Sequence, residues 1–91
     1  MSVRVLIPGP LRRLVEDASE LQLEGHTVIE VIKALETAAP GFRNRLTTDD
    51  GGLRRFFKVF VNDDDIARLK GPETPVRDGD VITIVPAAAG G

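Results

Sequence analysis

The chain of 91 residues contains no cysteine, one histidine, and neither tryptophan nor tyrosine. Without cysteine, it cannot form disulfides, thiolate zinc sites, iron–sulfur clusters or a thiol nucleophile. One histidine by itself makes neither a catalytic triad nor a histidine metal site. The chain also lacks a surplus of positive charge, since its formal net charge is -2. A general nucleic-acid-binding protein needs a basic surface, so the charge balance argues against that class.

Long apolar runs are missing as well, so no segment is typical of a signal peptide or a membrane span. The first apolar run, Val5-Leu6-Ile7, is interrupted at once by Pro8-Gly9-Pro10. We therefore expect a cytoplasmic protein. With 42% hydrophobic and 29% charged residues, the composition is typical of one small globular domain.

Apolar residues recur in short alternating runs and in one helical stripe. Alternation over residues 2–7 and 20–24 predicts two strands joined as a hairpin, while residues 11–19 have no clear pattern. Thr27 and Glu30 fit a capping box that opens a helix, and Pro40-Gly41 stops it. The stripe predicted to be buried comprises Val28, Val31, Ile32, Leu35 and Ala39, and the face predicted to meet solvent comprises Glu30, Lys33, Glu36 and Thr37.

The second half of the sequence predicts two further strands. Residues 41–55 are expected to be a connection, with an exposed turn at 49–52 and a short helical turn around Phe42 to Leu46. Residues 56–61 have strong strand propensity, and 62–65 are predicted to be a turn. A stretch that is mostly loop then leads to the almost wholly apolar last strand, 81–85.

The order strand, strand, helix, strand, strand predicts an α+β domain with a mixed sheet of four to five strands and one main helix packed across it. The single-domain β-grasp arrangement of ubiquitin has this order, with its first and last strands parallel in the centre. Burial in the centre would explain the apolar last strand. We expect residues 1–86 to form this domain and residues 87–91 to be a flexible tail.

No motif predicts that the chain is an enzyme by itself. His26 lies before the helix cap without a suggested cysteine or serine partner, so we interpret it as a loop residue. Asp63-Asp64-Asp65 lacks the spacing and distal glutamate of a calcium loop, which favours a solvated turn and no metal. Four arginines flank the long connection and are interpreted as a charged rim, with docking of an acidic partner as the alternative: Arg43, Arg45, Arg54 and Arg55.

The most informative feature is the pair Gly90-Gly91, which closely follows the last predicted strand. Extended, residues 86–91 reach roughly 20 Å. Glycines lack a Cβ atom and fit a narrow channel. The carboxylate of Gly91 would then be a reactive group on an arm that a partner enzyme can bind. A frayed tail is the alternative, but the position directly after a β-grasp domain favours the functional interpretation.

Several segments carry a resemblance to a known family. Residues 61–63, 78–86 and 89–91 resemble the MoaD/ThiS family of ubiquitin-like sulfur carriers, and Gly25-His26-Thr27-Val28 resembles the family's Gly-x-Thr-Val helix start. Within the family, the sequence is most similar to the CysO branch, which is associated with cysteine biosynthesis.

The resemblance implies that a partner adenylyltransferase of the ubiquitin-activating type uses ATP and Mg²⁺ to form an acyl-adenylate on Gly91. A sulfur source then replaces AMP and leaves a thiocarboxylate, with Gly90 and Ala89 giving access. The chain itself would bind no nucleotide. Expected partners are a sulfur-accepting enzyme, such as cysteine synthase or the large subunit of molybdopterin synthase, a rhodanese-like sulfur donor, and a metalloprotease that releases the product. Neither nucleic acid nor a membrane is expected as a partner.

Two other classes stay open: a ubiquitin-like modifier conjugated to lysines through Gly91, and a noncovalent β-grasp binding subunit. Ubiquitin-type tails carry arginines before the glycine pair, whereas this chain has alanines at 87–89. The alanines favour the carrier.

A docking face is also predicted from strand alternation. Phe57, Val59 and Val61 share one face of their strand, which places Phe60 on the other. Together with Val85, Phe60 is predicted to form an exposed apolar patch beside the tail, where a partner enzyme binds. In the alternatives, the loop 66–77 covers Phe60, or the faces are inverted and Phe60 is core.

Overall fold

The computed structural model describes residues 2–42 and 57–86. Several predicted features therefore lie outside the described residues: the turn at 49–52, most of the helical turn near Phe42, and the four arginines at 43, 45, 54 and 55. The described elements are β1 (Ser2–Leu6), η1 (Gly9–Val15), β2 (Glu20–Glu24), α1 (Val28–Ala38), β3 (Phe57–Val61), β4 (Asp64–Asp65), η2 (Ile66–Arg68), η3 (Gly71–Glu73) and β5 (Val81–Pro86), where η denotes a 3₁₀ helix.

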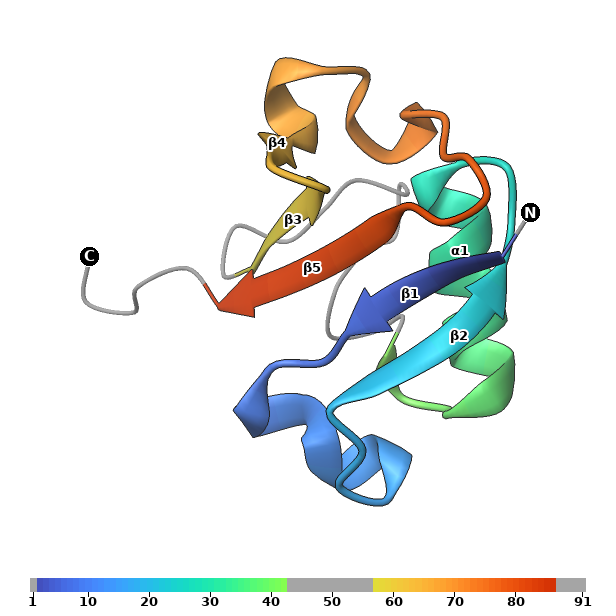
Figure 1. The fold of residues 1–91 in the computed structure, drawn as a ribbon. Coiled ribbons are helices and arrows are strands. Elements are labelled where there is room, and N and C mark those ends of the chain that lie inside the picture. The colour runs from blue at the N-terminus through green and yellow to red at the C-terminus, as the bar shows by residue number, and fades with distance from the viewer. Residues whose placement is uncertain (1, 43–56, 87–91) are drawn as a thin grey trace.

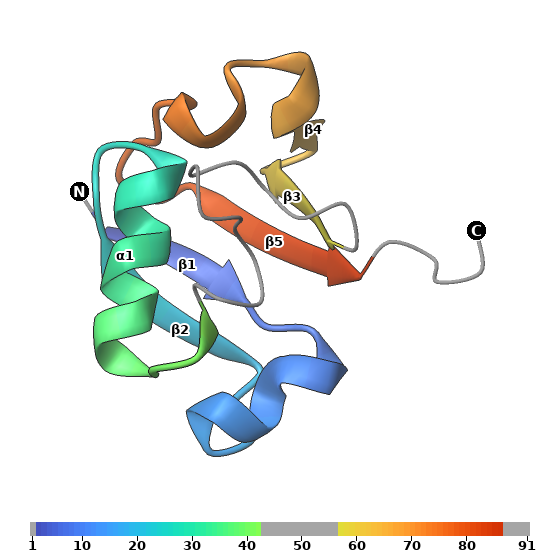
Figure 2. The ribbon, with the colours of Figure 1, turned by 180° about the vertical axis from the view of Figure 1, so that it is seen from behind.

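The strands form one mixed sheet in the order β2-β1-β5-β3-β4 (Figure 1). The first strand pairs antiparallel with β2 and parallel with β5, while β5 pairs antiparallel with β3. The predicted parallel pairing of the first and last strands is confirmed. The helix covers one face of this sheet, as the view from behind shows (Figure 2).

The core lies between α1 and the covered face of the sheet. All five residues of the predicted helical stripe are buried. They pack with the inward residues of the central strands, such as Val5 of β1, Val59 of β3 and Ile82 of β5, each 1% exposed. The last strand was expected to be apolar because it is buried on both faces in the centre of the sheet. This explanation is wrong, because β5 is buried on one face only. Ile82 and Ile84 are core, whereas Val81 is half-buried and Val85 is 37% exposed.

The start of α1 follows the predicted capping box with one difference. The Oγ1 atom of Thr27 accepts a hydrogen bond from the backbone N–H of Glu30 at 3.3 Å. The Glu30 carboxylate accepts from the backbone N–H of His26 at 3.0 Å, and not from that of Thr27. The loop after η3 fixes this end of the helix, since Val28 N–H donates to Thr74 O and Val76 N–H donates to His26 O, both at 3.0 Å.

The end of α1 departs from the predicted solvent face. Glu36 was expected to point into water, but it is half-buried. Its Oε2 atom accepts hydrogen bonds from the backbone N–H groups of Gly41 at 2.8 Å and Phe42 at 3.1 Å. The carboxylate thus holds the chain where it leaves the helix, and this contact helps to fix the position of Phe42, whose side chain is fully buried in the core.

Three segments differ from their predicted conformation. The turn predicted at 62–65 is shorter, because Asp64 and Asp65 pair with Val61 and Phe60 as β4. The segment with no clear pattern, 11–19, contains most of the 3₁₀ helix η1. The predicted loop 66–80 contains η2 and η3. Each of these elements is too short for a periodic signal in the sequence.

Candidate functional site

The candidate site is the end of the sheet from which the tail departs. The described part of β5 ends at Pro86, which pairs with Phe57 of β3. The predicted reactive Gly91 and the access residues Gly90 and Ala89 lie outside the described residues. The structure therefore defines the surface around the root of the tail, formed by the ends of β1, β5 and β3.

The sheet face opposite α1, which we call the outer face, carries apolar side chains at this end together with Thr83 and the exposed Lys58. Strand register aligns Leu6 of β1, Thr83 of β5 and Phe60 of β3 in one row across the sheet. Residues directly opposite one another in neighbouring strands project on the same face. Val85 lies two residues further along β5, opposite Lys58. Leu6 and Phe60 are half-buried, so this row leaves partly exposed apolar surface beside the tail root.

The predicted assignment of faces in β3 is confirmed. Val59 and Val61 are buried, at 1% and 7% exposure, and Phe57 packs against the core. Phe60 projects from the outer face and does not belong to the core, so the inverted assignment is wrong. The structure thus brings Phe60 and the exposed Val85 onto one face, although their role in docking stays a prediction.

A shallow groove of about 320 Å³ lies next to this patch, between the end of β1 and the end of β5. Its lining includes Leu6, Pro8 and Arg12 on one side, with Val85 and Pro86 on the other. Arg12 is held there because its Nε–H donates to the carbonyl of Ile7 at 2.9 Å. Sequence reasoning missed Leu6 and Arg12, although the expected parallel pairing of the first and last strands places Leu6 beside β5.

Two residues that carried the family resemblance meet at the opposite end of β5. Asn62 Nδ2 donates to Asp80 Oδ1 at 3.2 Å, and Asn62 Oδ1 accepts from the backbone N–H of Val81 at 3.1 Å. The second oxygen of Asp80 accepts from Arg77 N–H at 2.9 Å. Asn62 holds a positive φ of 56°, a conformation that asparagine tolerates better than most residues. These hydrogen bonds join the residue after β3 to the start of β5, at the opposite end of that strand from Pro86.

The remaining polar candidates have structural surroundings. His26 is exposed in the loop before α1. Asp65 Oδ1 accepts from Ala67 N–H at 2.9 Å and caps η2. Within residues 2–42 and 57–86, no three histidine or acidic side chains are grouped to hold a metal ion. No helix in the same described ranges is long and apolar enough to cross a membrane.

A mixed sheet with parallel β1 and β5 at its centre, crossed by one helix, is the ubiquitin-like β-grasp fold, and known structures with this fold superpose on the chain. The sequence matches the ThiS family over residues 5–91, and the chain belongs to that family.

Its relatives are small carrier and modifier proteins. The sulfur carrier protein CysO of Mycobacterium tuberculosis is 39% identical over 93 aligned residues, which span 100% of both chains. A chain of the crystal structure of the Amycolatopsis orientalis BexX/CysO complex has a TM-score of 0.92 and 40% identity, covering 98% of this chain and 99% of that one. The small archaeal modifier protein 1 of Methanosarcina acetivorans has a TM-score of 0.84 and 28% identity, covering 99% of this chain and 96% of that one.

Proposed function

We propose that this protein is a sulfur carrier that works as a protein substrate of partner enzymes, with sulfur held as a thiocarboxylate on Gly91. The observation that carries the proposal is the Gly90-Gly91 pair, which lies within a family match that extends to residue 91. Full-length similarity to a protein named as a sulfur carrier supports it.

The chemistry requires activation, because a carboxylate has no leaving group that sulfide can displace. The Gly91 carboxylate attacks the α-phosphate of ATP, which forms the acyl-adenylate and releases pyrophosphate. Hydrosulfide then attacks the acyl carbon. A C–S bond forms, the C–O bond to AMP breaks, and one proton is released with AMP, leaving the thiocarboxylate. Mg²⁺ and ATP belong to the partner adenylyltransferase in this scheme.

The described surface supports such a partner. The sheet holds the tail root at Pro86, and the apolar residues Phe60 and Val85 lie on the outer face at this end of β5. An enzyme of the ubiquitin-activating type that contacts this patch would receive the tail in a defined direction. Once the patch is bound, the C-terminal tail is already close to the active site of the enzyme. Its entry into that site would then cost less entropy than the binding of a free tail.

For the pathway, we propose transfer of the sulfur to a cysteine synthase, as the similarity to CysO suggests. Molybdopterin synthase, a rhodanese-like donor and a product-releasing metalloprotease stay secondary partners. Conjugation to lysines through Gly91 is the second candidate function. The likeness to a small archaeal modifier protein supports it, whereas the alanines at 87–89 favour the carrier.

Intact-mass spectrometry tests the proposal directly. The purified protein is incubated with its adenylyltransferase, ATP, Mg²⁺ and sulfide. We expect a mass gain equal to the exchange of one oxygen for sulfur, located by fragmentation to Gly91. Deletion of Gly91 or addition of one residue after it should abolish the gain, whereas Ala87→Gly keeps the tail length and should retain it.

Two results would contradict the carrier. One is an unchanged mass under conditions in which the enzyme activates a known carrier. The other is isopeptide-linked conjugates in cells without any thiocarboxylate, which would favour the modifier instead.

A further inference from the structure

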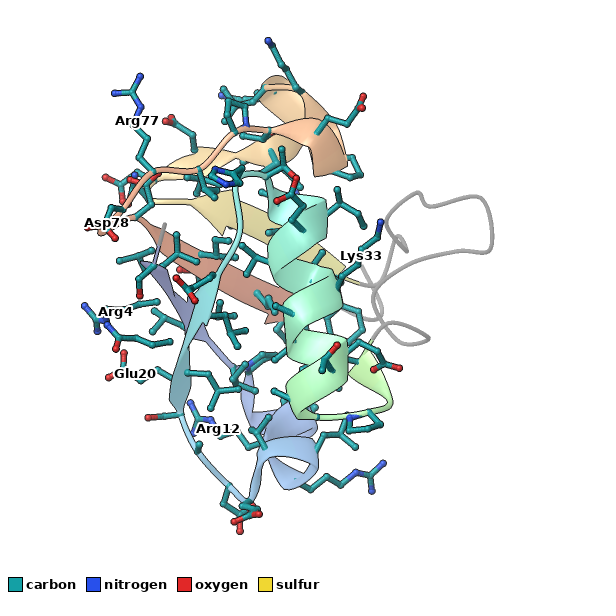
Figure 3. The ribbon with its side chains drawn as sticks, turned by 90° about the vertical axis from the view of Figure 1, so that its right-hand side faces the viewer. Arg4, Arg12, Glu20, Lys33, Arg77 and Asp78 are labelled. Carbon is teal, nitrogen blue, oxygen red and sulfur yellow. The ribbon has the colours of Figure 1, made fainter. Side chains whose placement is uncertain are left out.

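The outer edge of β2 is a possible binding surface that has no role in the proposed sulfur-carrier function. In the part of the chain that the structure describes, β2 is the terminal strand of the sheet and pairs only with β1. Figure 3 views the molecule from the side on which β2 runs beside α1, with Arg4 and Glu20 on the far side of the strand from the helix. An edge strand with unpaired backbone groups is a template for a further strand.

The pairing register identifies which backbone groups face outward. Ile7 N–H donates to Ser19 O at 2.9 Å, just beyond the paired strands. Bonded and non-bonded pairs alternate along an antiparallel ladder. Leu21 and Leu23 therefore exchange hydrogen bonds with β1, while Glu20, Gln22 and Glu24 direct their backbone N–H and C=O groups away from it.

The side chains of β2 divide between two surfaces. Leu21 and Leu23 are half-buried against the core side, whereas Glu20, Gln22 and Glu24 are exposed on the outer face. A strand added to this edge would thus place alternate residues beside the leucines and beside the polar row. Glu20 is already paired with Arg4, with Nη2 and Oε2 at 2.8 Å, whereas Glu24 forms no such ion pair with the residues at 2–42 and 57–86 that the structure describes.

A hollow accompanies the edge on the core side. It has a volume of about 260 Å³ and lies between β2 and the end of α1. Its lining comprises one acidic residue, Glu16, and five apolar residues, Leu14, Val15, Leu21, Ala38 and Ala39. A cavity of about 150 Å³ already admits benzene, so this hollow has room for an aliphatic side chain. Peptides that extend a sheet gain affinity from main-chain hydrogen bonds and specificity from such pockets.

From these observations we propose that the β2 edge binds an extended partner segment in which aliphatic residues alternate with lysine or arginine. The aliphatic residues lie over Leu21 and the hollow, and the cations face Gln22 and Glu24. A second copy of this chain fits poorly, because antiparallel pairing of two β2 strands about Gln22 would place Glu20 opposite Glu24. Like charges directly opposite one another destabilise a sheet.

Nuclear magnetic resonance titration with a designed peptide tests the proposal on the intact protein. The probe is an acetylated, amidated pentapeptide of alternating lysine and valine, with lysine at both ends and in the centre. We expect shift changes at the amides of residues 20, 22 and 24, and slower exchange of these amides with solvent. A peptide of the same composition with the valines adjacent should bind at least about tenfold more weakly, because it cannot alternate.

Two pairs of variants separate backbone pairing from charge. Gln22→Pro removes an outward N–H that β1 does not use and should weaken binding about tenfold, whereas Gln22→Val should not. Glu24→Lys should weaken it roughly threefold. The same charge change at the exposed Glu73, in η3, should leave it unaffected.

The proposal fails if the peptide leaves these amides unchanged at millimolar concentration, or if both peptides bind alike. It also fails if shifts appear at Phe60 and Val85 instead, or if the amides become protected only as the protein associates with itself. None of these results bears on thiocarboxylate formation, which is measured separately by mass.

Discussion

At the scale of single residues, Gly25 shows how closely β2 and α1 approach. A Cβ atom added at this position would lie 2.8 Å from Val31 Cγ2, 3.0 Å from Val31 N and 3.2 Å from Glu30 C. Two of these neighbours belong to the helix backbone, which cannot move without shifting α1. Gly25 is thus required by the packing of the strand end against the helix.

We predict that Gly25→Ala destabilises the protein by about 1–3 kcal/mol, the range typical of overpacking. Urea unfolding followed by circular dichroism measures the change. Gly9→Ala is the matched control, since an added Cβ there meets nothing within 4 Å, and it should change stability by less than about 0.5 kcal/mol. If Gly25→Ala lost as little stability as Gly9→Ala, a small shift of the helix would be relieving the crowding at Gly25, and the prediction would be wrong.

At the scale of elements, α1 is fastened to neighbouring parts of the chain at both ends. Thr27, Glu30 and the 74–76 segment hold its start, while Glu36 binds the chain after its end. The first and last turns of a helix leave N–H and C=O groups without helical partners. Two of these contacts satisfy N–H groups of the first turn, those of Val28 and Glu30, while the Glu36 contacts hold the chain that follows the last turn.

We predict that Thr27→Ala lowers the free energy of unfolding by about 1 kcal/mol, because the N–H of Glu30 loses its acceptor. Thermal or urea unfolding gives the value. Thr37→Ala removes the same atoms from an exposed position inside the helix, where Oγ1 donates to Lys33 O, and should be nearly neutral. If Thr27→Ala were equally neutral, the bonds from Thr74 and His26 would be sufficient to hold the helix start.

At the scale of the whole molecule, the two faces of the sheet have different surroundings, one in the core and the other partly exposed to solvent. One face packs against α1, and the other carries the partly exposed residues beside the tail root. A substitution can therefore alter one property without the other, depending on which side of β3 it falls. Neighbouring residues of this strand, Val59 and Phe60, lie on opposite sides.

We predict that Phe60→Asp reduces adenylation by the partner enzyme on the order of tenfold, as expected for loss of a central interface residue, while the protein stays folded. ATP–pyrophosphate exchange measures activation, and circular dichroism monitors the fold. Val59→Asp should unfold the chain, because it buries an unpaired charge. Thr37→Asp, on the exposed side of α1, should affect neither property. Unfolding by Phe60→Asp would mean that Phe60 acts as core, and normal activation would remove it from the docking surface.

The sequence by itself determined the order of the four longer strands and the helix, the buried stripe of α1 and the two faces of β3. These features follow from periodicity, which each segment expresses within a few residues of itself. The sequence also makes Gly90 and Gly91 candidate site residues, through their residue type and their place after the last strand, and their role stays a prediction.

Only the tertiary structure decided which residues surround the tail root and which edge stays open. The Leu6–Arg12 side of the groove meets Val85 because β1 and β5, about 80 residues apart in sequence, pair in parallel. The contact of the Glu36 carboxylate with Gly41 N–H and the pairing of Asp64 with Val61 likewise appear only in the folded chain. Each depends on backbone groups that another part of the chain leaves unpaired, and the periodicity of a single segment carries no information about a partner outside it.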